Sequence, residues 1–255
     1  LLLLFMRIME KWLTENEELL DNLKKILENE SAILIIRHSE RYEITCYEEI
    51  ANAGLTEKGK ARAIEFGRRI PIKKYIRFFS SPIDRCVQTA ELIKQGLLEN
   101  HWNSNIHFEK EQLNIQFMPV LQGPNGDWWQ MSSLLAKEGH MNMVSKWIFG
   151  HYSPAILEPF NEYVIRLAYF IFAHHEKAQK AVLDIISTHD ITIMALLCGL
   201  MGEMRHYDWV EYFGGFILQL KENSIVIYYG KEKKEIKFPY WWPVRNLIEE
   251  GRLIK

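Results

Sequence analysis

Residues 32–41 read AILIIRHSER, an apolar run that passes directly into an arginine and a histidine. The run Ala32–Ile36 is continuous rather than alternating, which is typical of a strand that is covered on both faces. Strands of this kind belong to α/β folds, in which ligands bind just outside the carboxyl ends of the strands. The stretch therefore predicts a central strand that carries functional side chains, Arg37 and His38, at its end.

Two other segments repeat this arrangement of an apolar strand followed at once by polar residues. They are Tyr75–Ser80, which precedes Ser81, Pro82 and Arg85, and Ala181–Ser187, which precedes His189 and Asp190. Each of the three strands is followed by a helical pattern of apolar residues. We expect Thr56 to open the first helix, Ser81 to cap and Pro82 to begin the second, and Gly199 to end the third. This alternation predicts a three-layer α/β/α sandwich with a mainly parallel central sheet.

The remaining segments are assigned around this sheet. The pattern predicts an amphipathic helix over Trp12–Leu27 and a β-hairpin over Phe216–Leu220 and Ser224–Tyr229. The polar run Lys231–Lys234 is expected to be a solvated turn. A stretch of about 99–180 is long, rich in tryptophan and partly helical, and we expect it to be an insertion that caps the substrate.

The composition is that of an ordinary globular protein, with 255 residues of which 48% are hydrophobic and 25% charged. We expect one domain over residues 1–255. There are 31 basic and 33 acidic residues, a balance that argues against a nucleic-acid-binding protein. No apolar run is long enough to span a membrane, so no membrane-spanning segment is expected.

The cysteines and the first residues bear on the compartment. Cys46, Cys86 and Cys198 are odd in number and widely spaced, which predicts neither a disulfide framework nor a metal site. Free thiols favour a reducing compartment such as the cytoplasm. The apolar start Leu1–Met6 leaves a secreted or periplasmic location open, because it could be the remnant of a signal.

The ends of the three strands are expected to bring their side chains together at one edge of the sheet. The set consists of Arg37, His38, Arg41, Arg85, His189 and Asp190. Three guanidinium groups repel one another unless an anion lies between them, and their planar forks match the oxygens of a phosphate. A metal ion is disfavoured because the set holds one carboxylate and several cations. The sequence therefore predicts a phosphoryl-binding pocket without a metal or cofactor.

A histidine in such a pocket is a candidate nucleophile. Neighbouring positive charge lowers the pKa of an imidazole and so keeps its lone pair available. The arginines would neutralise the oxygens of the phosphoryl group during its transfer. An acid must then protonate the leaving oxygen, and Asp190 lies next to the pocket.

These segments resemble the histidine phosphatase superfamily. Arg37–Arg41 is similar to its RHGxR signature, and LTEKGKARA at 55–63 to the start of its first helix. SSPIDRCVQTAELI at 80–93 and STHDITIMALL at 187–197 resemble the family's second and last motifs, in the family's order. The resemblance implies a phosphoglycerate-mutase-like fold and, through the His189-Asp190 dipeptide, lies closer to the histidine acid phosphatase branch.

The resemblance also implies a role for each matching residue. His38 would form a phosphohistidine, and Arg37, Arg41, Arg85 and His189 would hold the phosphoryl group. Asp190 would be the acid, as in the acid phosphatase branch. The mutase-like branch uses a glutamate in a segment matched here by 121–130, where the expected positions hold other residues, so Asp127 is the alternative acid. Ser39 replaces the family's usual glycine.

The expected activity is hydrolysis of a small phosphomonoester. Residues 99–180 hold eight acidic and six basic residues, whereas a cap for a polyphosphorylated substrate should be basic. Two alternatives stay open: a phosphoglycerate-mutase-like phosphotransferase, and a non-catalytic protein that binds a phosphorylated ligand. The sequence makes no prediction about the oligomeric state.

Overall fold

The protein was analysed as a computed structural model, which describes residues 2–26, 29–44, 49–71, 75–101, 107–110, 133–134, 136–178, 180–202, 209–239 and 242. The helices are α1 (Leu2–Lys25), α2 (Glu49–Asn52), α3 (Glu57–Arg69), α4 (Asp84–His101), α6 (His140–Ile148), α7 (Phe160–Glu176) and α8 (Asp190–Met201). The strands are β1 (Ala32–Arg37), β2 (Tyr75–Ser80), β3 (His107–Lys110), β4 (Leu183–Thr188), β5 (Gly215–Leu220), β6 (Ser224–Tyr229) and β7 (Glu232–Lys237). None of the described helices has both the length and the apolar character that crossing a membrane requires.

The strands form one mixed sheet in the order β3-β2-β4-β1-β5-β6-β7. The four strands β3, β2, β4 and β1 pair in parallel, whereas β5, β6 and β7 are added antiparallel to the β1 edge. The α/β class is confirmed. The parallel arrangement holds for the half of the sheet that carries the polar strand ends, and the hairpin at 216–229 is confirmed as β5 and β6.

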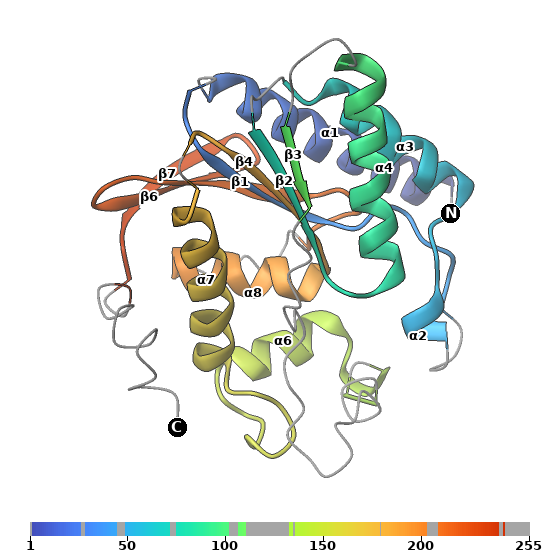
Figure 1. Cartoon of the computed structure of the whole chain (residues 1–255). Coiled ribbons are helices and arrows are strands. Elements are labelled where there is room, and N and C mark those ends of the chain that lie inside the picture. The colour runs from blue at the N-terminus through green and yellow to red at the C-terminus, as the bar shows by residue number, and fades with distance from the viewer. Residues whose placement is uncertain are drawn as a thin grey trace.

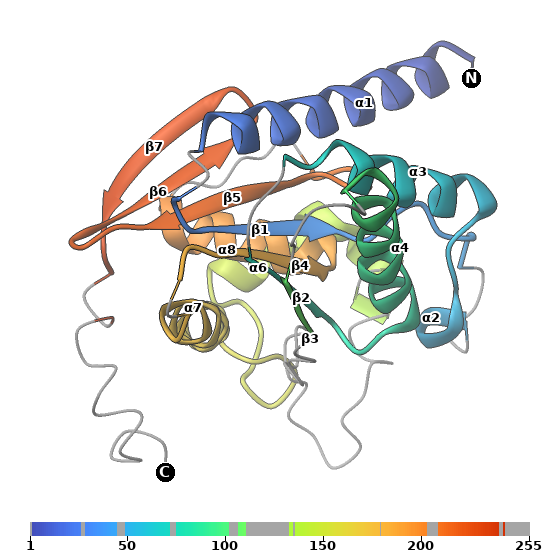
Figure 2. The ribbon, with the colours of Figure 1, turned by 45° about the horizontal axis from the view of Figure 1, so that its top comes forward.

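Helices cover both faces of the sheet, as Figures 1 and 2 show. On one face, α1, α3 and α4 pack on the strands through side chains such as Leu23, Phe66 and Ile93. On the other face, α6, α7 and α8 enclose a second core that includes Trp147, Leu167 and Ile193. The strands β1, β2 and β4 are therefore buried on both sides, which explains their largely apolar sequences.

Parts of the stretch 99–180 belong to the sandwich itself. β3 pairs in parallel with β2 and forms the edge of the sheet, with Tyr75 opposite His107. α7 buries Tyr163, Leu167 and Phe172 against the sheet. The apolar face of α7 is thus needed for the second core, and a capping role for the other residues of the stretch remains a prediction.

Three local predictions were wrong in instructive ways. The helix after β2 begins at Asp84 rather than at Pro82, and the side chain of Ser81 contacts a histidine instead of capping the helix. α8 does not end at Gly199 but continues to Met201 and is capped by Gly202, whose φ of 68° suits a helix end. The run Lys231–Lys234 is not only a turn, because β7 begins at Glu232 and pairs with β6.

α3 and α4 approach each other closely because glycines face the partner helix. A Cβ atom at Gly96 would lie 1.9 Å from the carbonyl oxygen of Ile64, and one at Gly67 would lie 2.1 Å from that of Ile93. Since both contacts are with backbone atoms, no side chain can move aside to make room. The pair therefore fixes how the helix that carries Arg85 sits on the sheet.

Replacing Gly96 with alanine tests this packing. We expect Gly96→Ala to lower the free energy of unfolding by about 1–3 kcal/mol, because the helices must separate. Gly54→Ala is the matched control, since its nearest neighbour is Gln88 Oε1 at 3.5 Å, and it should change stability by less than about 0.5 kcal/mol. Urea unfolding of both variants measures the difference, and equal stabilities would contradict the packing argument.

Candidate functional site

The carboxyl ends of β1, β2 and β4 lie side by side at one edge of the sheet. The register pairs Arg37 with Thr188 and Ser80 with Ser187. Beyond the strands, the amide of His38 donates to the carbonyl of Thr188 at 2.9 Å, and the amide of Ser81 donates to that of Ser187 at 3.0 Å. The backbone ladder thus continues for one residue and places the following side chains next to one another.

His38 is buried and held in one orientation. Its ring is 3% exposed, and Nδ1 lies 2.8 Å from the carbonyl oxygen of Ser39. Because a carbonyl oxygen only accepts, Nδ1 carries the proton and Nε2 carries the lone pair. The Nε of Arg85 donates to this Nε2 at 3.1 Å. The free nitrogen of His38 therefore faces the guanidinium group of Arg85.

His189 lies on the other side of Arg85. Arg85 Nη2 is 3.4 Å from His189 Nδ1, and Ser81 Oγ is 3.0 Å from His189 Nε2. Since a guanidinium only donates, Nδ1 is the acceptor and the Nε2 proton points to Ser81. The two imidazole rings are 5.6 Å apart at an angle of 71°. Arg85, itself 6% exposed, thus contacts both rings from within the protein.

Both imidazoles are held in their neutral form. Burial lowers the pKa of His38 well below its usual 6.5; repulsion from His189 when that ring is protonated, and from the permanent charges of Arg37 and Arg85, lowers it further. Burial lowers the pKa of His189 to about 3, helped most by the charge of Arg85. The lone pair on His38 Nε2 is therefore available at neutral and at mildly acidic pH.

Arg37 is bound by a turn that sequence patterns did not single out. Its two terminal nitrogens donate to the Val210 carbonyl at 2.9 Å and to Asp190 Oδ2 at 3.0 Å. Trp209 Nε1 donates to the same Asp190 oxygen at 3.1 Å, and the Ile191 amide donates to Oδ1 at 2.8 Å. Several donors thus stabilise the ionised form of this carboxylate. The Nε of Arg37 is buried and has no hydrogen-bond partner among the described residues.

Tyr212 supports both Arg37 and His38. The guanidinium carbon of Arg37 lies 4.3 Å from the centre of the Tyr212 ring, and the His38 ring is 5.7 Å away from it. The next residue, Phe213, is buried with a φ of 61°, an uncommon conformation for a non-glycine residue. The strained residue therefore directly follows the tyrosine whose ring packs against Arg37.

Two predicted site residues are not part of this contact network. Arg41 donates to the carbonyl of Tyr42 at 2.8 Å, and it reaches the cluster through its charge, which contributes to the lowered pKa of His189. Asp127 lies outside the described residues. The predicted residues thus form two groups of direct contacts. One joins Arg37 to Asp190, and the other joins Arg85 to His38 and His189.

Ser39, which stands where a glycine was expected, has a packing role. It is fully buried, its hydroxyl donates to the Gly59 carbonyl at 2.8 Å, and its amide donates to Thr89 at 3.0 Å. A Cβ atom at Gly59 would lie 2.1 Å from the carbonyl oxygen of Glu40. The loop after His38 therefore sits directly on the first turn of α3.

The described side chains suit an anion better than a metal ion. Arg85 and Arg37 supply guanidinium donors, and the two neutral imidazoles add ring nitrogens. The carboxylate in the cluster, Asp190, is already bound by Arg37 and Trp209. A tetrahedral phosphoryl group would meet several donors here together with two ring nitrogens that carry lone pairs, His38 Nε2 and His189 Nδ1.

Sequence reasoning missed the supporting residues Ser81, Trp209, Val210 and Tyr212. Ser81 was assigned to helix capping because serine before proline is a common helix start. The other three belong to the turn before β5, where no periodicity marks them. The available signal was the aromatic pair Trp209 and Tyr212 directly before Gly214 and Gly215.

Comparison with known proteins identifies a family for this arrangement. The model of the histidine phosphatase superfamily (branch 1) matches residues 33–214. No curated protein sequence matches the chain.

Among solved structures, a phosphoserine phosphatase from Entamoeba histolytica with 3-phosphoglyceric acid is 16% identical, with 83% of this chain and 99% of that chain covered and a TM-score of 0.49. A phosphoglycerate mutase from Bacillus anthracis is 14% identical, with 82% and 94% covered and a TM-score of 0.48. The family match does not confirm the closer relation to the acid phosphatase branch.

The contact between Tyr212 and Arg37 predicts a loss of activity when the ring is removed. A guanidinium over an aromatic ring contributes about 0.5–2 kcal/mol, so Tyr212→Leu should lower kcat/KM for an aryl phosphate by about 2- to 30-fold. Tyr212→Phe keeps the ring and should stay within about twofold of the unchanged protein.

A control separates this effect from a general loss of stability. Tyr75 lies at the other end of the sheet, with its ring 4.6 Å from Lys180 Nζ, and Tyr75→Leu removes a similar contact without touching the site. It should leave kcat/KM unchanged. Equal losses in the Tyr75 and Tyr212 leucine variants would show that Tyr212 does not act on the site.

Proposed function

Since the chain belongs to the histidine phosphatase superfamily, we propose that it hydrolyses a small phosphomonoester through a phosphohistidine on His38. The observation that supports this proposal best is the state of His38 Nε2. Its ring is buried, Nδ1 is fixed by Ser39, and Nε2 keeps a lone pair that faces the guanidinium group of Arg85. A nucleophile needs this combination of a neutral ring and an adjacent site for the reacting anion.

The first step is transfer of the phosphoryl group to the protein. The lone pair of His38 Nε2 forms a bond to phosphorus, and the bond between phosphorus and the ester oxygen breaks. The Nε–H of Arg85, which donates to the imidazole in the free protein, donates instead to a phosphoryl oxygen. The guanidinium group thus stabilises the negative charge that develops on the phosphoryl oxygens. The leaving oxygen receives a proton from an acid.

The second step returns the protein to its starting state. A water molecule attacks phosphorus, the bond between phosphorus and Nε2 breaks, and the water proton passes to the carboxylate that acted as the acid. Until it dissociates, the phosphate product is held by the guanidinium groups of Arg85 and Arg37. The buried Nε of Arg37 supports this role, because it is a donor without a partner among the described residues.

We assign the acid to Asp190, the carboxyl group that reaches the cluster within the described residues. Its Oδ2 now accepts from Arg37 and Trp209, so it must exchange a guanidinium contact for a proton when substrate binds. A phosphoryl group that attracts Arg37 would allow this exchange. The relation to the acid phosphatase branch rests on the same residue, and Asp127 is the alternative acid.

Replacing the nucleophile tests the proposed function. His38→Ala should abolish turnover of p-nitrophenyl phosphate, because it removes the proposed nucleophile. His174→Ala is the matched control, since its ring stacks on Phe170 away from the site, and it should keep full activity. Retained turnover in His38→Ala would overturn the proposal. Phosphate binding without any turnover by the unchanged protein would favour a binding protein, and isomerised phosphoglycerate would favour a mutase.

The lowered pKa of His38 predicts how the ring titrates. In an NMR pH titration of the free protein, the His38 signals should stay those of a neutral imidazole well below pH 6.5. The unfolded chain binds a proton near pH 6.5 that the buried ring rejects, so the free energy of unfolding should fall as pH drops through that value. A ring that becomes protonated near pH 6.5 would contradict the account.

The acid can be identified from its dependence on the leaving group. Asp190→Asn should lower kcat for a phenyl or alkyl phosphate by about 10²- to 10⁴-fold, because these leaving groups need a proton. It should affect p-nitrophenyl phosphate much less, since that phenolate leaves without one. An equal loss for all substrates would show instead that Asp190 acts by holding Arg37.

A further inference from the structure

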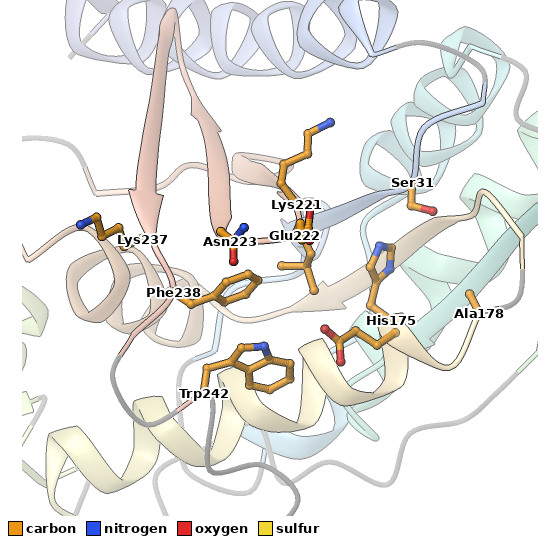
Figure 3. A pocket seen from close by; sticks show the side chains of 11 residues that line it. Ser31, His175, Ala178, Lys221, Glu222, Asn223, Lys237, Phe238 and Trp242 are labelled. Carbon is orange, nitrogen blue, oxygen red and sulfur yellow. The ribbon is translucent and has the colours of Figure 1, made fainter.

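A cavity lies at the amino ends of the parallel strands, the end of the sheet opposite to His38. It has a volume of about 490 Å³, within the usual range for small-molecule sites. Its wall combines the end of α7, the β5–β6 turn and the residues after β7, with Ser31 just before β1 and Ala178 just before β4 (Figure 3). Since Ser31 and Ala178 precede parallel strands, the cavity is at their amino ends.

A buried ionic network reaches this cavity through His175. Arg77 binds both oxygens of Asp184 at 2.7 Å, and His175 Nδ1 is 2.6 Å from Asp184 Oδ2. All three residues are 5% exposed or less. Burying an ion pair is costly, and the mechanism proposed for His38 does not use this one. Its clear geometric effect is to fix the ring of His175.

The fixed ring presents a hydrogen-bond acceptor to the cavity. The Asp184 carboxylate only accepts, so Nδ1 of His175 carries a proton and Nε2 is the ring nitrogen left to accept a hydrogen bond. Nε2 has no hydrogen-bond partner among the described residues, although His175 is only 5% exposed. Figure 3 shows the ring projecting from α7 between Ser31 and the β5–β6 turn. A ligand with an N–H group would complete it.

Aromatic side chains form the wall next to this acceptor. The rings of Phe238 and Trp242 stack at 17° with their centres 5.9 Å apart, and Trp242 is held by Phe172 at 5.2 Å. Trp242 is only 2% exposed, so the half-buried Phe238 is the ring of this pair that a ligand can reach. The charged residues at the rim are Lys221, Lys237, Glu176 and Glu222, two of each sign. A flat surface with a balanced rim favours a planar uncharged ligand over a phosphate or another anion.

We infer that this cavity is a binding site for a planar, uncharged nitrogen heterocycle of the nucleobase class, which stacks on Phe238 and donates an N–H to His175 Nε2. The site is separate from the phosphoryl pocket, and the inference does not depend on the proposed function. Ligands of this size bind with a Kd on the order of 1 mM or somewhat below.

Binding is measured by saturation-transfer NMR and calorimetry with adenosine, uridine and theophylline at up to 5 mM. At least one should bind saturably to the unchanged protein. Caffeine carries a methyl group in place of the N–H of theophylline, so if theophylline binds, caffeine should bind at least fivefold more weakly. Binding of benzoate alone, or of no probe at all, would overturn the inference.

Variants place the binding at this cavity. His175→Phe keeps a ring but removes the acceptor, and should weaken binding at least tenfold. His174→Phe is the matched control, because that ring stacks on Phe170 and does not line the cavity. Phe238→Leu leaves the network intact and should also weaken binding, so it tests the site even if His175→Phe unfolds. Unchanged affinity in both cavity variants would contradict the inference.

Discussion

The buried guanidinium of Arg85 contacts two imidazole rings, and the other features of the site follow from this contact. A cation placed beside His38 and His189 disfavours their protonation, while burial acts in the same direction. The rings therefore remain acceptors of N–H groups instead of repelling the arginine. Positive charge is thus concentrated at the carboxyl ends of the parallel strands, in a protein whose formal net charge is only −2.

Two elements hold this contact in place from opposite sides. The helix α4 brings Arg85 over the strand ends, and the glycine contacts between α3 and α4 set its position. The turn at 209–214 binds Arg37 and Asp190 and places Tyr212 beside His38. The antiparallel half of the sheet thus contributes support, whereas the parallel half contributes the reacting side chains.

The strand ends could be predicted from the sequence because each apolar run stops at polar or charged residues. Arg37, His38, Arg85 and His189 are read directly from such runs, and α3 is read from Thr56, whose hydroxyl caps it. The short edge strand β3, with four residues, and the charged strand β7 have no comparable signal. Their formation depends on the neighbouring strand rather than on their own composition.

Contacts between distant residues could not be predicted in this way. The pairing of Asp190 with Arg37 depends on Trp209 and Val210, which lie in a turn without periodicity. The network of Arg77, Asp184 and His175 joins β2, β4 and α7, and only the sheet order brings these residues together. Polar residues inside apolar strands do indicate such networks, but they do not identify the partners.

The covalent state of His38 during turnover tests the central claim most directly. The protein would be mixed with ³²P-labelled aryl phosphate, quenched within milliseconds, and digested for mass spectrometry of the labelled peptide. We predict one phosphoryl group on Nε2 of His38, which forms in a burst and disappears at the rate of turnover. Hydrolysis without any label on His38, or with the label on another residue, would contradict the account.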